Sequence, residues 1–90
     1  MTRFARMPEV IETPVDDELF VVLPGGEEIF HLDAIAAAIW RALAEPAGAD
    51  ELGRLFEAAF PDVPAGQIAT DVTTALERLS RDGLLVAADS

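Results

Sequence analysis

The sequence has few of the side chains that carry acid–base, nucleophilic or metal chemistry. It contains no cysteine and no tyrosine, and its one histidine is His31. The stretch "PGGEE" lacks the glycine spacing of phosphate-binding loops. No second histidine or spaced acid cluster joins His31 as a metal ligand, and a lone histidine on a strand is usually a packing or surface residue. We therefore expect a non-catalytic protein without a cofactor or a metal site.

Positive charge and long apolar runs are also scarce. Six basic residues stand against 17 acids, for a formal charge of -11. Such a chain repels a phosphate backbone, so nucleic acid is not an expected partner. A basic peptide or protein patch would be attracted, although solubility explains the same charge equally well.

No apolar run approaches the roughly 20 residues of a membrane span, and no apolar segment follows Arg3 and Arg6 as in an export signal. We therefore expect a cytoplasmic protein that does not enter the membrane, which agrees with the lack of cysteine. With 90 residues, of which 51% are hydrophobic, the chain has the composition of a globular protein. A chain of this size forms one domain, residues 1–90 with a core of about 9–86.

Three strand patterns occupy the first third of the chain. They run from Glu9 to Val15, from Glu18 to Pro24 and through "EEIFHL", where turn-forming residues separate them. In the third pattern, alternation places Ile29 and His31 on one face and Phe30 and Leu32 on the other. Pro14 favours an edge position for the first strand.

At Asp33 the apolar spacing changes to that of a helix, and Asp33 is suited to cap it. Trp40 is expected to anchor the core, and Gly83 to end the third helix. "LLVA" after Gly83 is expected to be a short extended tail. The predicted helices run from about Ala34 to Ala44, Ala49 to Phe60 and Pro64 to Arg81. The sequence thus predicts an α+β, winged helix-turn-helix-like domain, with an N-terminal antiparallel three-stranded sheet followed by three helices.

The order of several short motifs resembles the PqqD family. This family is named for its member in pyrroloquinoline quinone biosynthesis, and its fold is also called the recognition element of ribosomally synthesised, modified (RiPP) precursor peptides. The motifs are His31-Leu32-Asp33, the small-residue run Ala36 to Trp40, Glu51-Leu52, Asp71-Val72 with Leu76 and Leu79, and Gly83-Leu84-Leu85. The resemblance covers about Glu18 to Val86. It departs from the family pattern at Asp33, usually asparagine, at Gly48, often threonine or serine, and at Pro64, commonly aspartate.

The resemblance implies a non-catalytic peptide chaperone. It would hold the leader segment of a precursor peptide as an added strand and present the peptide to a modifying enzyme, such as a radical S-adenosylmethionine protein, a leader peptidase or a cyclase. The backbone of Glu28 to Leu32, including Phe30, would pair with the leader. Ile29 and His31, with Val72, Ala75 and Leu76, would form shallow pockets, and Asp71 and Arg78 would supply polar contacts.

Two alternatives remain open from the sequence. A winged-helix transcription regulator would use the same three helices, but its third helix would carry bases only near its end, at Arg78 and Arg81. A small scaffold subunit of a biosynthetic enzyme would need an exposed apolar patch away from the strand edge. The oligomeric state is expected to be a monomer or a weak homodimer, since an open strand edge can pair with its own copy.

Overall fold

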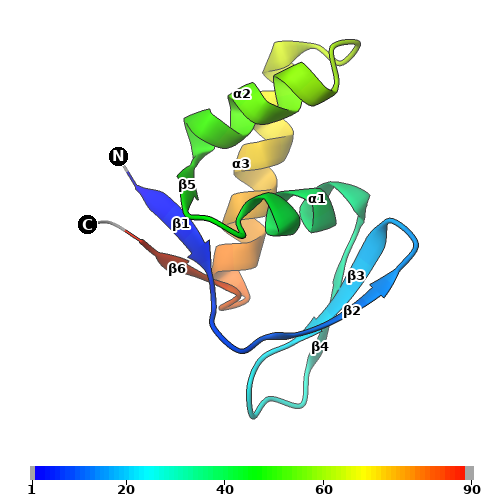
Figure 1. Cartoon of the computed structure of the whole chain (residues 1–90), viewed down its shortest axis with the longest axis vertical. Helices are drawn as coiled ribbons and strands as arrows, with labels where there is room; N and C mark the ends of the chain where they lie inside the picture. The colour runs from blue at the N-terminus through cyan, green and yellow to red at the C-terminus, as the bar shows by residue number, and fades with distance from the viewer. Residues whose placement is uncertain (1, 89–90) are drawn as a thin grey trace.

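The computed structural model describes residues 2–88 and has the α+β architecture that the sequence predicts. Within these residues the strands form two three-stranded antiparallel sheets, in the orders β2-β3-β4 and β5-β1-β6 (Figure 1). The elements in chain order are β1 (Arg3–Arg6), β2 (Ile11–Val15), β3 (Glu18–Val22), β4 (Ile29–Leu32), α1 (Ala34–Ala42), β5 (Ala47–Gly48), α2 (Ala49–Ala59), α3 (Ala65–Arg81) and β6 (Leu85–Ala87).

The β2-β3-β4 sheet is the meander expected from the three strand patterns. β2 lies at one edge, which confirms the position inferred from Pro14. This strand begins two residues later than predicted, because Glu9 lies in a turn with φ of 66°. Gly25, with φ of 75°, supplies the left-handed residue of the turn between β3 and β4, and the Gly26 amide donates to the Leu23 carbonyl oxygen at 3.0 Å.

The passage from β4 into α1 is capped as the sequence predicts. The Asp33 side chain accepts a hydrogen bond from the Ala36 amide, with the oxygen and nitrogen 2.9 Å apart. This bond satisfies one of the amide groups that have no partner inside the first helical turn. β4 is therefore followed by a helix without an intervening loop.

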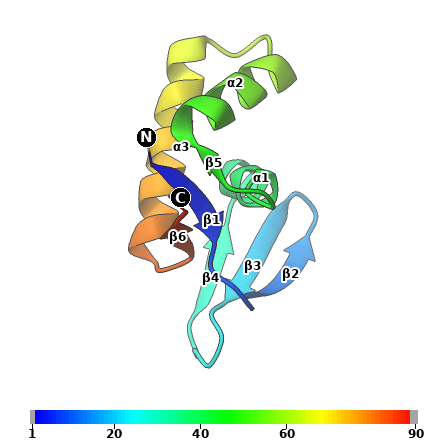
Figure 2. The ribbon, with the colours of Figure 1, turned by 60° about the vertical axis from the view of Figure 1, so that its left-hand side comes forward.

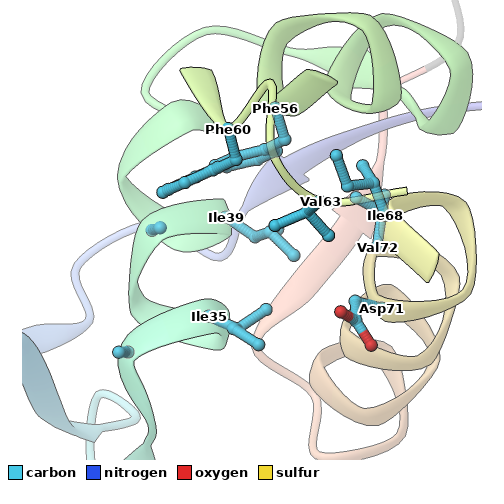
Figure 3. A pocket seen from close by; sticks show the side chains of 10 residues that line it. Ile35, Ile39, Phe56, Phe60, Val63, Ile68, Asp71 and Val72 are labelled. Carbon is cyan, nitrogen blue, oxygen red and sulfur yellow. The ribbon is translucent and has the colours of Figure 1, made fainter. Parts of the chain in front are cut away.

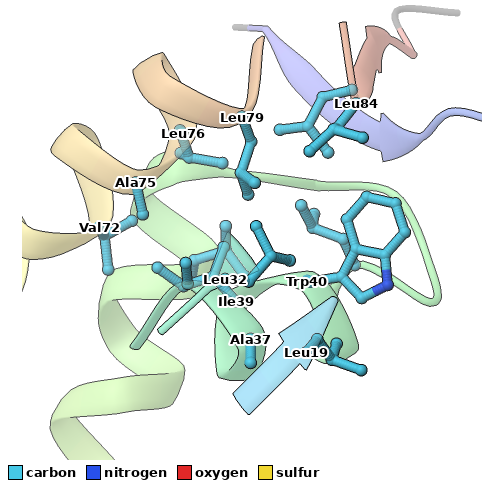
Figure 4. Close-up of a cluster of buried hydrophobic side chains, with 14 of the residues drawn as sticks. Leu19, Leu32, Ala37, Ile39, Trp40, Val72, Ala75, Leu76, Leu79 and Leu84 are labelled. Atoms are coloured by element: carbon cyan, nitrogen blue, oxygen red, sulfur yellow. The ribbon is translucent and has the colours of Figure 1, made fainter. Parts of the chain in front are cut away.

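The core lies between α1, α3 and the inner face of the β2-β3-β4 sheet. Trp40 on α1 is 1% exposed, which confirms its expected role as a core anchor. Figure 4 shows Leu19 and Leu32 from the sheet and Leu79 from α3 converging on the same cluster. Each large apolar side chain buried in this way contributes roughly 1.5–3 kcal/mol to folding. This cluster fixes the position of β4 relative to α3.

The second sheet is absent from the sequence prediction. β1 lies between β5 and β6, and the predicted extended tail is the β6 strand of this sheet. The close packing also explains Gly48, which departs from the family pattern, because a Cβ atom there would lie 3.2 Å from the Thr2 carbonyl oxygen. The Gly48 amide instead donates to the Glu51 carboxylate at 3.1 Å, which begins α2 without a capping hydroxyl.

Candidate functional site

β4 is an edge strand with one unpaired side. It pairs with β3, and within residues 2–88 no strand pairs with its other edge. β4 is also the strand of its sheet that lies toward α3, whereas β2 lies farthest from that helix (Figure 2). An unpaired strand edge offers a row of N–H and C=O groups to an incoming chain.

Pro14 indicates which main-chain groups of β4 point toward this open edge. Proline has no N–H and is tolerated on an edge strand where the nitrogen points away from the partner strand. Pro14 pairs with Leu19, and Leu19 pairs with Leu32. In an antiparallel ladder the direction of these groups alternates along each strand. Carried through this register, the alternation places the N–H and C=O groups of Ile29 and His31 on the open edge.

Arg78 supplies an independent observation that agrees with this assignment. Its Nη2 atom donates a hydrogen bond to the carbonyl oxygen of His31 at 2.9 Å. Arg78 lies on α3, so the His31 oxygen is directed toward α3 and away from β3. The guanidinium of arginine has five N–H donors, and this bond uses one of them.

A hollow that we call the edge groove continues from the end of β4 between α1 and α3. Its volume is about 130 Å³. Ile35 and Asp71 line both this groove and a larger neighbouring hollow. The edge groove is lined by Asp33, Ile35, Ala36, Asp71, Thr74, Ala75 and Arg78. The carboxylates of Asp33 and Asp71 and the guanidinium of Arg78 give it both signs of charge.

The neighbouring hollow, which we call the apolar cavity, lies between α1, α2 and α3. It has a volume of about 260 Å³ and apolar walls apart from Asp71 (Figure 3). The rings of Phe56 and Phe60 stack at its α2 side with centroids 6.1 Å apart. Phe60 is 50% exposed although it is aromatic. The cavity is large enough for one aromatic or branched aliphatic side chain.

Comparison with known proteins assigns this arrangement to a family. The family model of coenzyme PQQ synthesis protein D (PqqD) matches residues 18–85, which include β3, β4 and the three helices. The chain belongs to the PqqD family. No protein of curated function matches it in sequence.

A solved structure is similar over nearly the whole chain. It is TbiB1 in complex with the TbiA(beta) leader peptide, with a TM-score of 0.77 and 25% sequence identity. The similarity covers 96% of this chain and 99% of that chain. The PqqD-family fold predicted from the sequence is therefore confirmed.

The residues in and beside β4 that the resemblance to the PqqD family singles out differ in burial and direction. Glu28 precedes β4 and is exposed, and Ile29 and His31 lie on the sheet face opposite the core. Phe30 is half-buried and Leu32 is fully buried on the inner face. Along β4 the main-chain groups of Ile29 and His31 thus face the open edge and those of Phe30 and Leu32 face β3, while the side chains of the two sets lie on opposite faces of the sheet.

The predicted residues of α3 are not equally accessible. Val72, Ala75 and Leu76 are all less than 8% exposed and belong to the core. Ala75 nevertheless lines the edge groove, whereas Leu76 lines a hollow on another side of α3. Val72 lines the apolar cavity, so a change of Val72 to arginine would block that cavity and would also disrupt folding, because the side chain is buried. Asp71 is half-buried and Arg78 exposed, and both line the edge groove.

His31 makes its side-chain contacts on the outer face of the sheet. Its Nε2 atom is hydrogen-bonded to the Glu18 carboxylate, and its ring centroid lies 5.1 Å from that of Phe20. Within residues 2–88 no cluster of three or more potential ligands is placed to hold a metal ion. No helix in the same range has the length and apolar character needed to cross the membrane.

The sequence reasoning missed Ile35 and the aromatic wall of the apolar cavity. Helical spacing places Phe56 and Phe60 on the apolar face of the second helix with Leu52, and this spacing gives no sign of a cavity. One signal in the sequence could have indicated the exposure of Phe60. Pro61 ends the helix directly after Phe60, so no further helical turn follows that could cover the ring. The crossing of α2 over α3 that creates the cavity leaves no mark on local spacing.

Proposed function

We propose that this chain is a non-catalytic peptide-binding protein of RiPP biosynthesis. It holds the leader segment of a precursor peptide by β-strand addition and presents the peptide to a modifying enzyme. The observation that carries the proposal is the open edge of β4. There the main-chain N–H and C=O groups of Ile29 and His31 point away from β3, beside a groove lined by α1 and α3. Backbone pairing gives affinity in such a mode, and pockets for alternate side chains give selectivity.

The guest strand would continue the antiparallel order of the sheet. Antiparallel pairing is slightly more stable per residue than parallel pairing, and every pairing of this sheet is antiparallel. The N-terminal part of the guest would then pass the end of β4 toward α1 and reach the apolar cavity. An aromatic or aliphatic guest side chain would fill that cavity. Val72 and Ala75, which are buried, would act as walls behind the guest.

The charges of the groove set a polarity for the guest. Asp71 and Arg78 are two helical turns apart on α3, which corresponds to about 10 Å. An extended guest covers that distance with about three residues. A basic or amide side chain beside Asp71 and an acceptor beside Arg78, about three residues further along, would therefore complement the groove.

The free leader is expected to be disordered, so binding must order it. The host is already in place, because β4 and α1 are held by buried Leu32, Ile39 and Trp40. We therefore expect affinities between micromolar and high nanomolar. We place the complex in the cytoplasm, with a radical S-adenosylmethionine protein, a leader peptidase or a cyclase as the recipient.

Strand addition is tested by placing a proline at each edge of the sheet. Ile29→Pro removes an N–H from the open edge of β4, whereas Glu12→Pro places the same residue on the outward side of β2. Each variant is titrated by calorimetry with the TbiA(beta) leader peptide and with the precursor peptides encoded beside this gene. We expect Ile29→Pro to lose binding and Glu12→Pro to keep it, with folding checked by circular dichroism. Equal binding by folded Ile29→Pro and wild-type protein would exclude the mechanism.

A further inference from the structure

The outer face of the β2-β3-β4 sheet carries mostly apolar side chains although nothing in residues 2–88 covers it. The register aligns Ile11, Val22 and Ile29 in one row across the three strands, and Thr13, Phe20 and His31 in the next. Val15 and Glu18 form the third row. Ile11, Val15, Phe20 and Ile29 are 62%, 47%, 37% and 65% exposed. We call this surface the outer sheet face.

Such a face departs from the usual pattern of a small antiparallel sheet. The inner face holds Leu19, Val21 and Leu32 in the core, and the opposite face is then normally polar. Contiguous exposed apolar surface on a monomer commonly marks an interaction site. The outer sheet face is separate from the edge groove, because it lies across the sheet from the core and α1.

The charge around this face limits what can cover it. Between Arg6 and Arg41 the chain has no arginine and no lysine. The ends of the sheet carry acid pairs in the two turns, and Glu18 lies within the face, paired with His31. The acids of this stretch are Glu9, Glu12, Asp16, Asp17, Glu18, Glu27, Glu28 and Asp33.

A second copy of the chain would bring identical acidic rims together, and an anionic membrane would be repelled for the same reason. A surface with apolar centre and a basic rim is electrostatically complementary to it.

We propose that the outer sheet face is the docking surface for a second protein whose own patch is apolar and rimmed by arginine or lysine. The identification of that protein as the enzyme that modifies the bound peptide rests on the proposed function above. The peptide and the enzyme would then occupy one sheet without competing, the first at its edge and the second on its face.

The geometry also couples the two events. A guest strand beside β4 extends the sheet, and every second guest side chain joins the row of Ile29 or His31 on the outer face. The peptide-loaded protein therefore offers the enzyme a wider surface than the free protein does. Because binding free energies are linked, the enzyme must increase the affinity for the peptide by the same factor.

The experiment begins with a photo-crosslinking phenylalanine analogue in place of Phe20, in cells that contain the native gene neighbourhood. The matched control carries the analogue at Leu55, which is 51% exposed on α2 and lies outside this face. The maturation enzyme encoded beside the gene should be captured from Phe20 and not from Leu55. Capture of a second copy of the chain, or of nothing specific to Phe20, would overturn the proposal.

The captured enzyme is then titrated with purified variants. Ile11→Ser/Val15→Ser removes apolar surface on β2, and Leu55→Ser is its control. Asp17→Lys/Glu27→Lys reverses charge at the two ends of the face, and Glu57→Lys/Glu77→Lys makes the same charge change on the helices. We expect each of the two double variants on the sheet to weaken enzyme binding by about tenfold or more, and the control variants on the helices to have little effect.

Peptide titrations distinguish this proposal from the proposed function. The variants at Ile11 and Val15 lie on β2, away from the peptide edge, and should bind the peptides as the wild type does. Loss of enzyme binding with peptide binding retained supports the docking surface. Enzyme binding that survives both sets of sheet variants would refute it, whether or not any peptide binds at β4.

Discussion

Arg78 and His31, which are 47 residues apart in the chain, are joined by a hydrogen bond of 2.9 Å from the guanidinium to a main-chain oxygen. The bond links α3 to the open edge of β4, beside the groove proposed to hold the peptide. The guanidinium can keep this bond and donate others to a guest, because it has several further N–H groups.

The first prediction concerns this guanidinium. Arg78→Met should lower peptide affinity by about tenfold, since a hydrogen bond from a charged donor to the guest is lost. Arg81→Met removes the same charge one turn later, where the side chain lines a different hollow, and should have little effect. Calorimetric titration measures both. A rise in affinity for Arg78→Met would mean that the guanidinium closes the edge and must leave before the guest binds.

Amide exchange should report the alternation along β4. In the free protein the amide protons of Ile29 and His31 should exchange quickly, while those of Phe30 and Leu32, directed toward β3, should be protected. Peptide addition should protect Ile29 and His31 selectively. Residue-resolved exchange by NMR is the measurement. Equal protection of all four amides in the free protein would show that the edge is already closed.

Two glycine substitutions should change stability in opposite directions. Gly83 has φ of 78°, and Ala there should lower the free energy of unfolding by about 1 kcal/mol through backbone strain. Space is not the cause, because the nearest atom, Leu23 Cδ1, would lie 3.8 Å from the new Cβ. Gly53→Ala, inside α2 with no atom near its Cβ, should raise it by about 0.5–1 kcal/mol. Urea denaturation tests both, and a loss for Gly53→Ala would contradict the helix argument.

The cap of α1 should tolerate the residue usual in the family. Asp33→Ala removes the acceptor of the Ala36 amide and should cost about 1 kcal/mol of unfolding free energy. Asp33→Asn keeps an acceptor oxygen and should lower the free energy of unfolding by only a few tenths of a kcal/mol. Chemical denaturation of the two variants decides between the acceptor and the charge. An equal loss in both would show that the charge matters and that the hydrogen bond does not.

Features with local causes could be predicted from the sequence, and those made by distant segments could not. The helix beginning after Asp33, the inner and outer residues of β4, and the edge position of β2 follow from capping, alternation and Pro14. The bond between Arg78 and His31 and the cavity walled by Phe60 depend on how α1, α2 and α3 cross. β1 has no alternating apolar pattern, and its partners lie at Ala47–Gly48 and Leu85–Ala87.

The pairing of Phe4 with Ala87 ties the beginning of the chain to its end (Figure 1). Closing so long a loop carries a large entropic cost, which is recovered only once most of the intervening residues are ordered. We therefore expect the pairing of β1 with β6 to form late in folding and to be the first part of the structure that opens on heating. The strand proposed to receive the guest, β4, pairs with a neighbour close in the chain, so its sheet should be complete before β1 and β6 pair.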